Sequence, residues 1–157
     1  MIALRGPMKI ALGIVYLLAL GVGCATVPMS STSADVDAKQ FQTAPGMANI
    51  YLCRGEGLAP ELLAYTQLDE QTIGALAHGT YEEVSVAPGS HIVGVSGPTN
   101  VEQLPVDAVA GNSYFFIVTI RWAGPGIRHR HIEAMSDADG RSTVNSLSRA
   151  ATMTTMP

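Results

Sequence analysis

Three side chains with metal-binding chemistry alternate along one short segment of the chain: His129, His131 and Glu133. Side chains two residues apart in a strand point to the same face, so a strand here gathers all three. Two imidazoles and a carboxylate form a ligand set that zinc or iron accepts. The charges of Arg128 and Arg130 oppose a divalent cation at this place. The pattern therefore predicts a polar, solvent-facing strand, with a metal site on the His129/His131/Glu133 face as the alternative.

The second chemical feature is Cys24, which follows an uncharged apolar run over residues 10–23 that itself follows Lys9. The run has 14 residues, fewer than the roughly 20 that a membrane-spanning helix needs. A basic residue, an apolar run, small residues and a cysteine are together typical of a bacterial secretion signal that ends in a lipidation site. We expect cleavage before Cys24 and acylation of its sulfur and its new amino group. The alternative is an ordinary cleaved signal peptide.

The residues around Cys24 indicate where an anchored protein stays. Residues 21–25 resemble a bacterial lipobox, although Gly21 stands where leucine is usual. Ala25 follows the cysteine, whereas aspartate at that position tends to retain lipoproteins in the inner membrane. Each buried acyl CH₂ group contributes ~0.8 kcal/mol, so two or three chains give a permanent anchor. We expect a lipid-anchored protein on the periplasmic face of the outer membrane.

Two further side chains, one aromatic and one thiol, are informative outside the metal and lipid chemistry. Trp122 ends an apolar segment beside Arg121, just before a glycine-rich loop. An exposed tryptophan there is a possible partner contact, and the alternative is an aromatic ring that closes the rim of the core. Cys53 alternates with apolar residues, which indicates a buried, unreactive thiol.

The remaining polar side chains do not predict catalysis. His91 shares a strand face with Val93 and Val95, which favours a hydrogen-bonded structural histidine. Glu82 and Glu83 are adjacent and face opposite sides of a strand, so they cannot form a carboxylate pair, and we expect a solvated face. No nucleophile–base pair is visible in the sequence, so we expect a protein that is not an enzyme and binds no cofactor.

The net charge of the mature chain limits the classes of partner that it can bind. Removal of residues 1–23 leaves 134 residues with 7 basic and 13 acidic side chains, a net charge of −6. An acidic chain of this kind is a poor electrostatic match for nucleic acid. With Cys24 acylated, Cys53 has no disulfide partner, and the apolar core must hold the domain together.

The chain divides into four predicted parts. Residues 1–23 are the signal peptide, with Met8 as the expected natural start, and residues 24–46 are small and polar and predict a flexible tether. Within the tether, the alternative for residues 35–41 is a short helical turn with Phe41 packed on the domain. Residues 47–151 form the expected β-sandwich domain, and residues 152–157 a disordered tail.

Short apolar segments separated by turn residues predict an all-β domain. The expected strands cover residues 48–53, 62–68, 71–77, 80–86, 90–96, 113–121 and 128–135. Residues 113–121 are apolar on both faces, which indicates a central strand. Ser136 and Asp139 resemble a capping box before a short C-terminal helix. We therefore predict an antiparallel β-sandwich or partly open barrel of about seven strands with a short C-terminal helix.

A series of short motifs lies in this strand order: Ala48-Asn-Ile-Tyr51, Arg54, Ile73-Gly74, Leu76, Gly79-Thr80-Tyr81, Val86, Pro88-Gly89, His91, Ala110-Gly111 and Tyr114-Phe115. The series resembles the bacterial domain-of-unknown-function family 2846, whose members are often small lipoproteins, over residues 24–140. Residues 66–95 also resemble the small β-repeat named after its Pro-Glu-Gly-Ala motif, a surface-associated, non-catalytic module. These resemblances imply a β fold and no particular activity.

The functional expectation combines the anchor and the fold. We expect a membrane-anchored lipoprotein that acts as a non-catalytic structural or interaction module and contacts an envelope protein partner. The alternative is a periplasmic domain that binds a metal or another small ligand through the His129/His131/Glu133 face.

Overall fold

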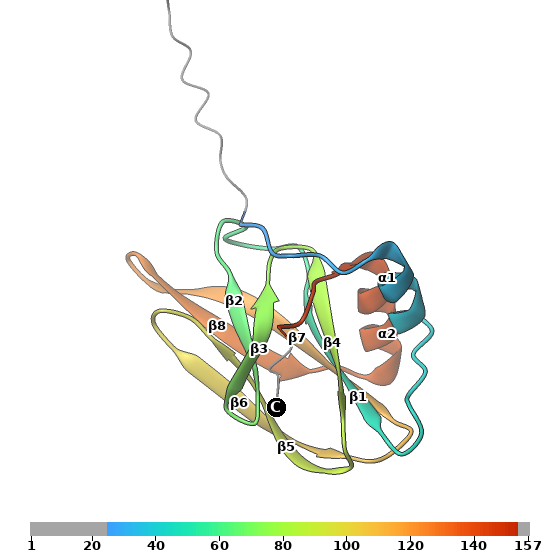
Figure 1. Cartoon of the computed structure of the whole chain (residues 1–157). Coiled ribbons are helices and arrows are strands. Elements are labelled where there is room, and N and C mark those ends of the chain that lie inside the picture. The colour runs from blue at the N-terminus through green and yellow to red at the C-terminus, as the bar shows by residue number, and fades with distance from the viewer. Residues whose placement is uncertain (1–24, 154–157) are drawn as a thin grey trace, which may run out of the picture.

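The computed structural model describes residues 25–153, and their strands form two sheets packed face to face (Figure 1). The five-stranded sheet has the order β8-β7-β1-β4-β9. Its strands are β8 (Ile127–Ala134), β7 (Ser113–Gly124), β1 (Ala48–Arg54), β4 (Thr80–Val86) and β9 (Ser148–Arg149). The four-stranded sheet has the order β3-β2-β5-β6. Its strands are β3 (Gln71–Leu76), β2 (Ala64–Leu68), β5 (Gly89–Ser96) and β6 (Val101–Ala108).

This architecture confirms the predicted β-sandwich with a short C-terminal helix. The long strand β7 lies between β8 and β1, so its predicted central position is correct. Two strand pairs are parallel, β1 with β7 and β4 with β9, which adds parallel pairing to an otherwise antiparallel fold. The strands β6 and β9 are additional to the expected set, and Pro105 is tolerated in β6 because β6 is an edge strand.

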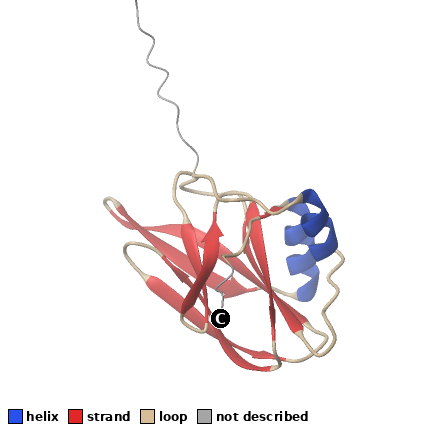
Figure 2. Ribbon diagram, viewed as in Figure 1, coloured by secondary structure: helices blue, strands red, loops and turns tan. Residues whose placement is uncertain are grey.

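The two faces of β7 pack against different cores. Phe116 and Val118 point between the sheets and join the main apolar cluster, while Phe115 points to the opposite face. Helix α2 (Asp137–Ser146) covers that opposite face, and a Cβ at Gly140 would overlap the Phe115 ring. Figure 2 shows that both helices lie on this outer side of the five-stranded sheet. The apolar residues on both faces of β7 are therefore explained by burial on both sides.

The start of α2 confirms Ser136 as the N-cap, and the reciprocal half of the predicted capping box is replaced by a contact between the two side chains. Ser136 Oγ accepts a hydrogen bond from the backbone N–H of Asp139 at 3.2 Å and donates one to the Asp139 carboxylate at 2.6 Å. The first of these bonds satisfies one of the backbone N–H groups that the first turn of a helix leaves without partners. Within residues 25–153, no helix is long and apolar enough to cross a membrane.

The turn between β2 and β3 forms without glycine. Asp69 and Glu70 have φ values of 48° and 67°, the left-handed conformation that a two-residue hairpin turn requires. The Asp69 carboxylate offsets this strain by accepting a hydrogen bond from the backbone N–H of Ile92 at 2.9 Å and contacting His91 Nδ1 at 2.7 Å. The hydrogen bond with Asp69 raises the pKa of His91. The structural role expected for His91 is confirmed.

The segment expected to be a flexible tether differs most from the sequence prediction. Residues 30–38 pack on the sandwich through helix α1 (Thr32–Ala38), which is capped by Ser31. The Tyr81 hydroxyl donates to Asp35 Oδ1 at 2.9 Å, and Lys39 Nζ donates to the other Asp35 oxygen at 2.8 Å. Polar composition suggested disorder, but here the polar atoms bond to the domain. We therefore correct the tether prediction for residues 25–46, while residue 24 lies outside the described residues.

The C-terminal segment also contacts the domain, although the sequence predicts a disordered tail from residue 152. The backbone N–H of Met153 donates to the carbonyl of Ile73 on β3 at 2.6 Å. Thr152 and Met153 line a cavity of about 400 Å³ beside the same strand. Residues 152–153 of the expected disordered tail are thus placed against β3, and residues 154–157 lie outside the described residues.

Candidate functional site

The predicted metal-binding residues lie on the outer face of β8, where His131 is held between two carboxylates. His131 Nδ1 lies 2.6 Å from Glu102 Oε1, and His131 Nε2 lies 2.7 Å from Glu133 Oε1. Arg121 Nη2 approaches the same Glu133 oxygen at 2.8 Å. The hydrogen bond with Glu102, reinforced by Glu133, raises the pKa of His131. The ring is therefore stabilised as a cation in an ion cluster.

This arrangement does not gather the three residues as ligands. Both ring nitrogens of His131 are already engaged by carboxylates, Nδ1 by Glu102 and Nε2 by Glu133. His129 lies across from Arg121 in the register of β7 and β8, and within residues 25–153 its side chain makes no hydrogen bond to either His131 or Glu133. Over the same residues, no group of three His, Cys, Asp or Glu side chains is placed to hold a metal ion. The polar, solvent-facing strand that the sequence favoured describes the face of β8 with His129, His131 and Glu133, whereas Arg130 and Ile132 on the other face are buried.

Trp122 lies at the far end of the β7–β8 hairpin, which projects beyond the sandwich (Figure 1). Its side chain is 59% exposed, so it does not close the rim of the core. The Arg128 guanidinium stacks on the indole, with its carbon 4.2 Å from the ring centroid. The structure therefore gives Trp122 the exposed position that a contact with a partner requires.

The structure bears on the prediction for only one of the two cysteines. Cys24, the predicted lipidation site, lies outside the described residues. Cys53 is fully buried on β1, and burial raises its pKa to about 12. A thiol that stays protonated at neutral pH is a poor nucleophile, so Cys53 is inert, as expected.

A feature that the sequence did not predict is the loop between β1 and β2, residues 55–63, which we call the apical loop. Arg54, at the end of β1, is 3% exposed. Its guanidinium donates to the carbonyls of Leu62, Ala59 (2.9 Å) and Leu76 (3.1 Å). One buried cation thus binds two carbonyls of the loop and one at the end of β3.

Arg130, from β8, holds the far end of the apical loop. Its Nε and Nη2 donate to the carbonyl of Leu63 at 3.1 and 2.8 Å. The side chain is 4% exposed, and it runs against Gly97, where a Cβ would overlap the guanidinium. Two strands of the five-stranded sheet therefore each supply an arginine to the same loop.

The electrostatics of these two arginines are unusual. Within residues 25–153, neither guanidinium forms a salt bridge with an acidic side chain. Burial lowers the pKa of Arg54, and the nearby charge of Arg130 lowers it further. Burial also lowers the pKa of Arg130. The cost of burying these charges is offset by hydrogen bonds to backbone carbonyls, which are strong because the donor is charged.

Further backbone contacts fix the apical loop. The N–H of Gly57 donates to His78 Nε2 at 2.8 Å, and Ala59 adopts a left-handed φ of 59°. The N–H of Ala25, the first described residue, donates to the carbonyl of Pro60 at 3.4 Å. The loop is therefore held by β1, by β8 and by the turn between β3 and β4, and residue 25 lies directly beside it.

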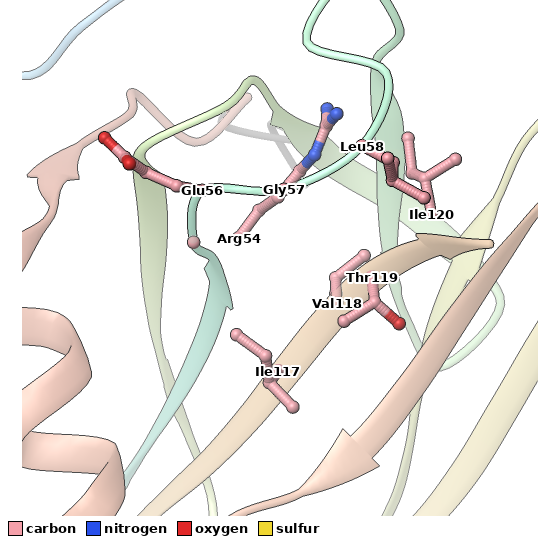
Figure 3. Close-up of a pocket in the computed structure, with 9 residues that line it drawn as sticks. Arg54, Glu56, Gly57, Leu58, Ile117, Val118, Thr119 and Ile120 are labelled. Carbon is pink, nitrogen blue, oxygen red and sulfur yellow. The ribbon is translucent and has the colours of Figure 1, made fainter.

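The tip of the apical loop exposes an apolar side chain. Leu58 is 71% exposed, the largest exposed fraction of the large apolar residues between 25 and 153. A groove of about 230 Å³ lies beneath it, between residues 54–58 and residues 117–120 of β7 (Figure 3). This volume is below the roughly 300 Å³ at which small-molecule pockets begin. The groove therefore gives no reason to assign a ligand, whereas the loop presents Leu58 outward on a fixed backbone.

Glu82 differs from its predicted solvated position. Its side chain is 1% exposed and points between the sheets, where Thr66 Oγ1 donates to Glu82 Oε2 at 2.5 Å. Gly74 on β3 makes room for it, since a Cβ there would overlap the carboxyl group. Burial raises the pKa of Glu82 to about 7. The prediction that Glu82 and Glu83 point to opposite faces holds, but the face of Glu82 is the core.

Comparison with known proteins gives one relative. An uncharacterized protein of Haemophilus influenzae is 24% identical over 140 residues, which cover 88% of this chain and 81% of that protein. No family model matches the chain, and no solved structure matches it significantly. The resemblance to the domain-of-unknown-function family 2846 and to the Pro-Glu-Gly-Ala repeat stays a prediction.

Proposed function

We propose that this protein is a lipoprotein of the bacterial envelope, anchored by acylated Cys24 to the periplasmic face of the outer membrane. Its sandwich acts as a non-catalytic structural or interaction module. The observation that carries the proposal is the order of Lys9, the apolar residues 10–23 and Cys24. This order is typical of a signal that ends in a lipidation site.

The placement of ionisable groups supports a structural role for the domain. Arg54 and Arg130 are occupied by backbone carbonyls, His91 by Asp69, and His131 by two carboxylates. Each of these groups has partners that hold one element to another. The donor and acceptor atoms of these groups are taken up by those partners, whereas acid–base catalysis requires a group that is free to exchange a proton with a substrate.

Metabolic labelling tests the anchor. Cells that express the full chain are grown with an alkyne analogue of palmitate, and the membranes are separated on a sucrose gradient. We expect label on the wild-type protein in the outer-membrane fraction and none on the Cys24→Ser variant. A wild-type protein without label, or mature protein free in the periplasmic fluid, would overturn the proposal.

The projecting hairpin supports an interaction with an envelope protein. Trp122 is exposed and carries a stacked Arg128, and tryptophan and arginine dominate the binding energy of many interfaces. A photo-reactive phenylalanine analogue at position 122 should crosslink a protein in intact cells. The same analogue at the exposed position Ile92 serves as the matched control. Equal crosslinking at both positions would remove Trp122 as the contact.

A further inference from the structure

The described chain begins next to the apical loop, and this determines which end of the domain carries the anchor. The hydrogen bond between Ala25 N–H and the carbonyl of Pro60 places residue 25 against that loop. The first isolated bridge of the chain, Met29 with Ala150, follows four residues later and ties the segment to the end of β9. The chain next to Cys24 thus has no long free segment that could separate the domain from a membrane.

The apical loop has the properties of a surface prepared for contact. Its backbone is fixed by Arg54 and Arg130, so little conformational freedom is lost when it meets another surface. Leu58 is exposed at its tip, and an exposed leucine gains free energy when it leaves water. The attachment point and the exposed apolar tip belong to the same end of the molecule.

We propose that the apical loop lies in the headgroup region of the leaflet that holds the acyl chains of Cys24, with Leu58 in contact with lipid. This inference rests on the proposed acylation of Cys24. The occupant of the surface is the bilayer itself, because the covalent anchor brings the loop to that bilayer. The domain therefore has a fixed orientation, with the opposite end of the sandwich directed away from the membrane.

The charges near Leu58 define the kind of membrane contact. Glu56 and Glu61 are both exposed and flank the apolar tip. Anionic lipid headgroups repel these carboxylates, so the contact depends on Leu58 and the anchor and does not depend on electrostatic attraction. A neutral leaflet is the favoured surface, and added anionic lipid weakens the contact of Leu58.

The opposite end of the sandwich supplies the control. The N–H of Gly111 donates to the carbonyl of Met47, so the β6–β7 loop lies where β1 begins, while the apical loop lies where β1 ends. The seven residues of β1 separate the two ends by about 20 Å. Val109, in the β6–β7 loop, is 56% exposed and matches Leu58 as an exposed apolar loop residue.

The test uses the full, acylated chain in vesicles. Leu58→Cys and Val109→Cys are each labelled with the fluorophore nitrobenzoxadiazole, which reacts selectively because Cys53 is buried and the Cys24 sulfur is acylated. The proteins are reconstituted into phosphatidylcholine vesicles, with and without brominated acyl chains that quench the fluorophore on contact. Intact mass and flotation establish beforehand that each sample is acylated and bound to the vesicles.

We expect a blue-shifted emission and loss of most of the intensity with brominated lipid at position 58, and neither effect at position 109. Equal quenching at both positions, or none at position 58 in acylated, vesicle-bound protein, would overturn the inference and leave the anchor intact. A mature protein with no acyl mass and no flotation would overturn the proposed function, and the inference with it.

Discussion

The outer face of β8 and the region beneath the apical loop use charged residues in opposite ways. On β8, His131, Glu133 and Arg121 are partly or largely exposed and neutralise one another. Beneath the apical loop, Arg54 and Arg130 are almost completely buried and bind only neutral carbonyls. Charges in water contribute little to stability, whereas a buried charge with several hydrogen bonds is costly to remove. The histidines and the glutamate of β8, which suggest a metal site in the sequence, therefore contribute less to the stability of the fold than the two buried arginines.

The largest effect is expected from removing Arg54. Arg54→Met leaves the carbonyls of Leu62, Ala59 and Leu76 without their donor, and we expect a loss of roughly 3 kcal/mol in the free energy of unfolding. Urea unfolding of the Cys24→Ser protein, with and without the second substitution, measures it. The control is Arg128→Met, which removes the stacking on Trp122 and an exposed hydrogen bond to the carbonyl of Ile127, and should cost less than about 1 kcal/mol. Equal effects of the two substitutions would contradict the contrast between the two regions.

The second effect concerns Glu82, the buried acid of the sandwich core. Its pKa of about 7 in the folded protein lies above the value of 4.5 expected for an exposed glutamate. The stability that its protonated form contributes is complete below pH 4.5 and is lost as the pH rises to about 7. At 1.36 kcal/mol for each pKa unit, the loss above pH 7 is roughly 3 kcal/mol.

The variant Glu82→Gln tests this sign. Glutamine resembles the protonated acid, so the variant should be more stable than the parent above pH 7 and should lose this part of the pH dependence. Glu83→Gln is the matched control, because the neighbouring side chain points to the other face of β4 and bonds to Tyr51 and Asn49. If Glu82→Gln has the same pH profile of unfolding as the parent, a buried, protonated Glu82 is ruled out.

A smaller effect is expected on the β8 face. The pKa of His131 is raised, chiefly by its hydrogen bond with Glu102, and Glu102→Gln should lower it. The charged form of His131 contributes stability that is complete below pH 6.5 and is lost as the pH rises through its raised pKa, while the lowered pKa of Glu133 contributes stability that is complete above pH 4.5 and is lost as the pH falls. Because the cluster is partly exposed, His131→Gln should change the free energy of unfolding by less than about 1 kcal/mol. The chemical shifts of the ring protons, followed by NMR over pH, measure the pKa, and a value below 6.5 would break the interpretation.

The smallest effect on folding is expected at Leu58. Because its side chain is largely exposed, Leu58→Ser should change the free energy of unfolding by less than about 0.5 kcal/mol. The same substitution should reduce the contact of the loop with lipid, since it removes the apolar tip. Thermal unfolding measures the effect on stability. Quenching by brominated lipid of a nitrobenzoxadiazole label at position 57 measures the contact of the loop with lipid. A large loss of stability would show that Leu58 belongs to the core of the loop.

The strands and the C-terminal helix were predictable because local pattern determines them. Alternation and turn residues located β1, β4 and β7 closely, and the pair Ser136 and Asp139 located the start of α2. The strand β6 was missed because Pro105 is unfavourable in a strand except at an edge, and edge position depends on the tertiary fold.

The buried charges were not predictable in the same way. Arg54 and Arg130 bond to carbonyls, and no sequence pattern marks which carbonyls a distant side chain will reach. Glu82 is accommodated by Gly74, on a strand that pairs in the other sheet. The polar segment 30–38 was expected to be free because its composition cannot form a core. It is held by hydrogen bonds to Tyr81 and Arg149 that come from distant positions in the chain.

The most direct test of the account is the distance between the domain and the membrane that carries it. Neutron reflectometry of the acylated protein on a supported bilayer measures the hydrated layer between headgroups and protein. We predict that the protein layer begins at the headgroups, because residue 25 is bonded to the apical loop and residues 30–38 pack on the domain. A water-filled gap of about 25 Å, the mean span of a flexible tether over residues 25–46, would contradict it.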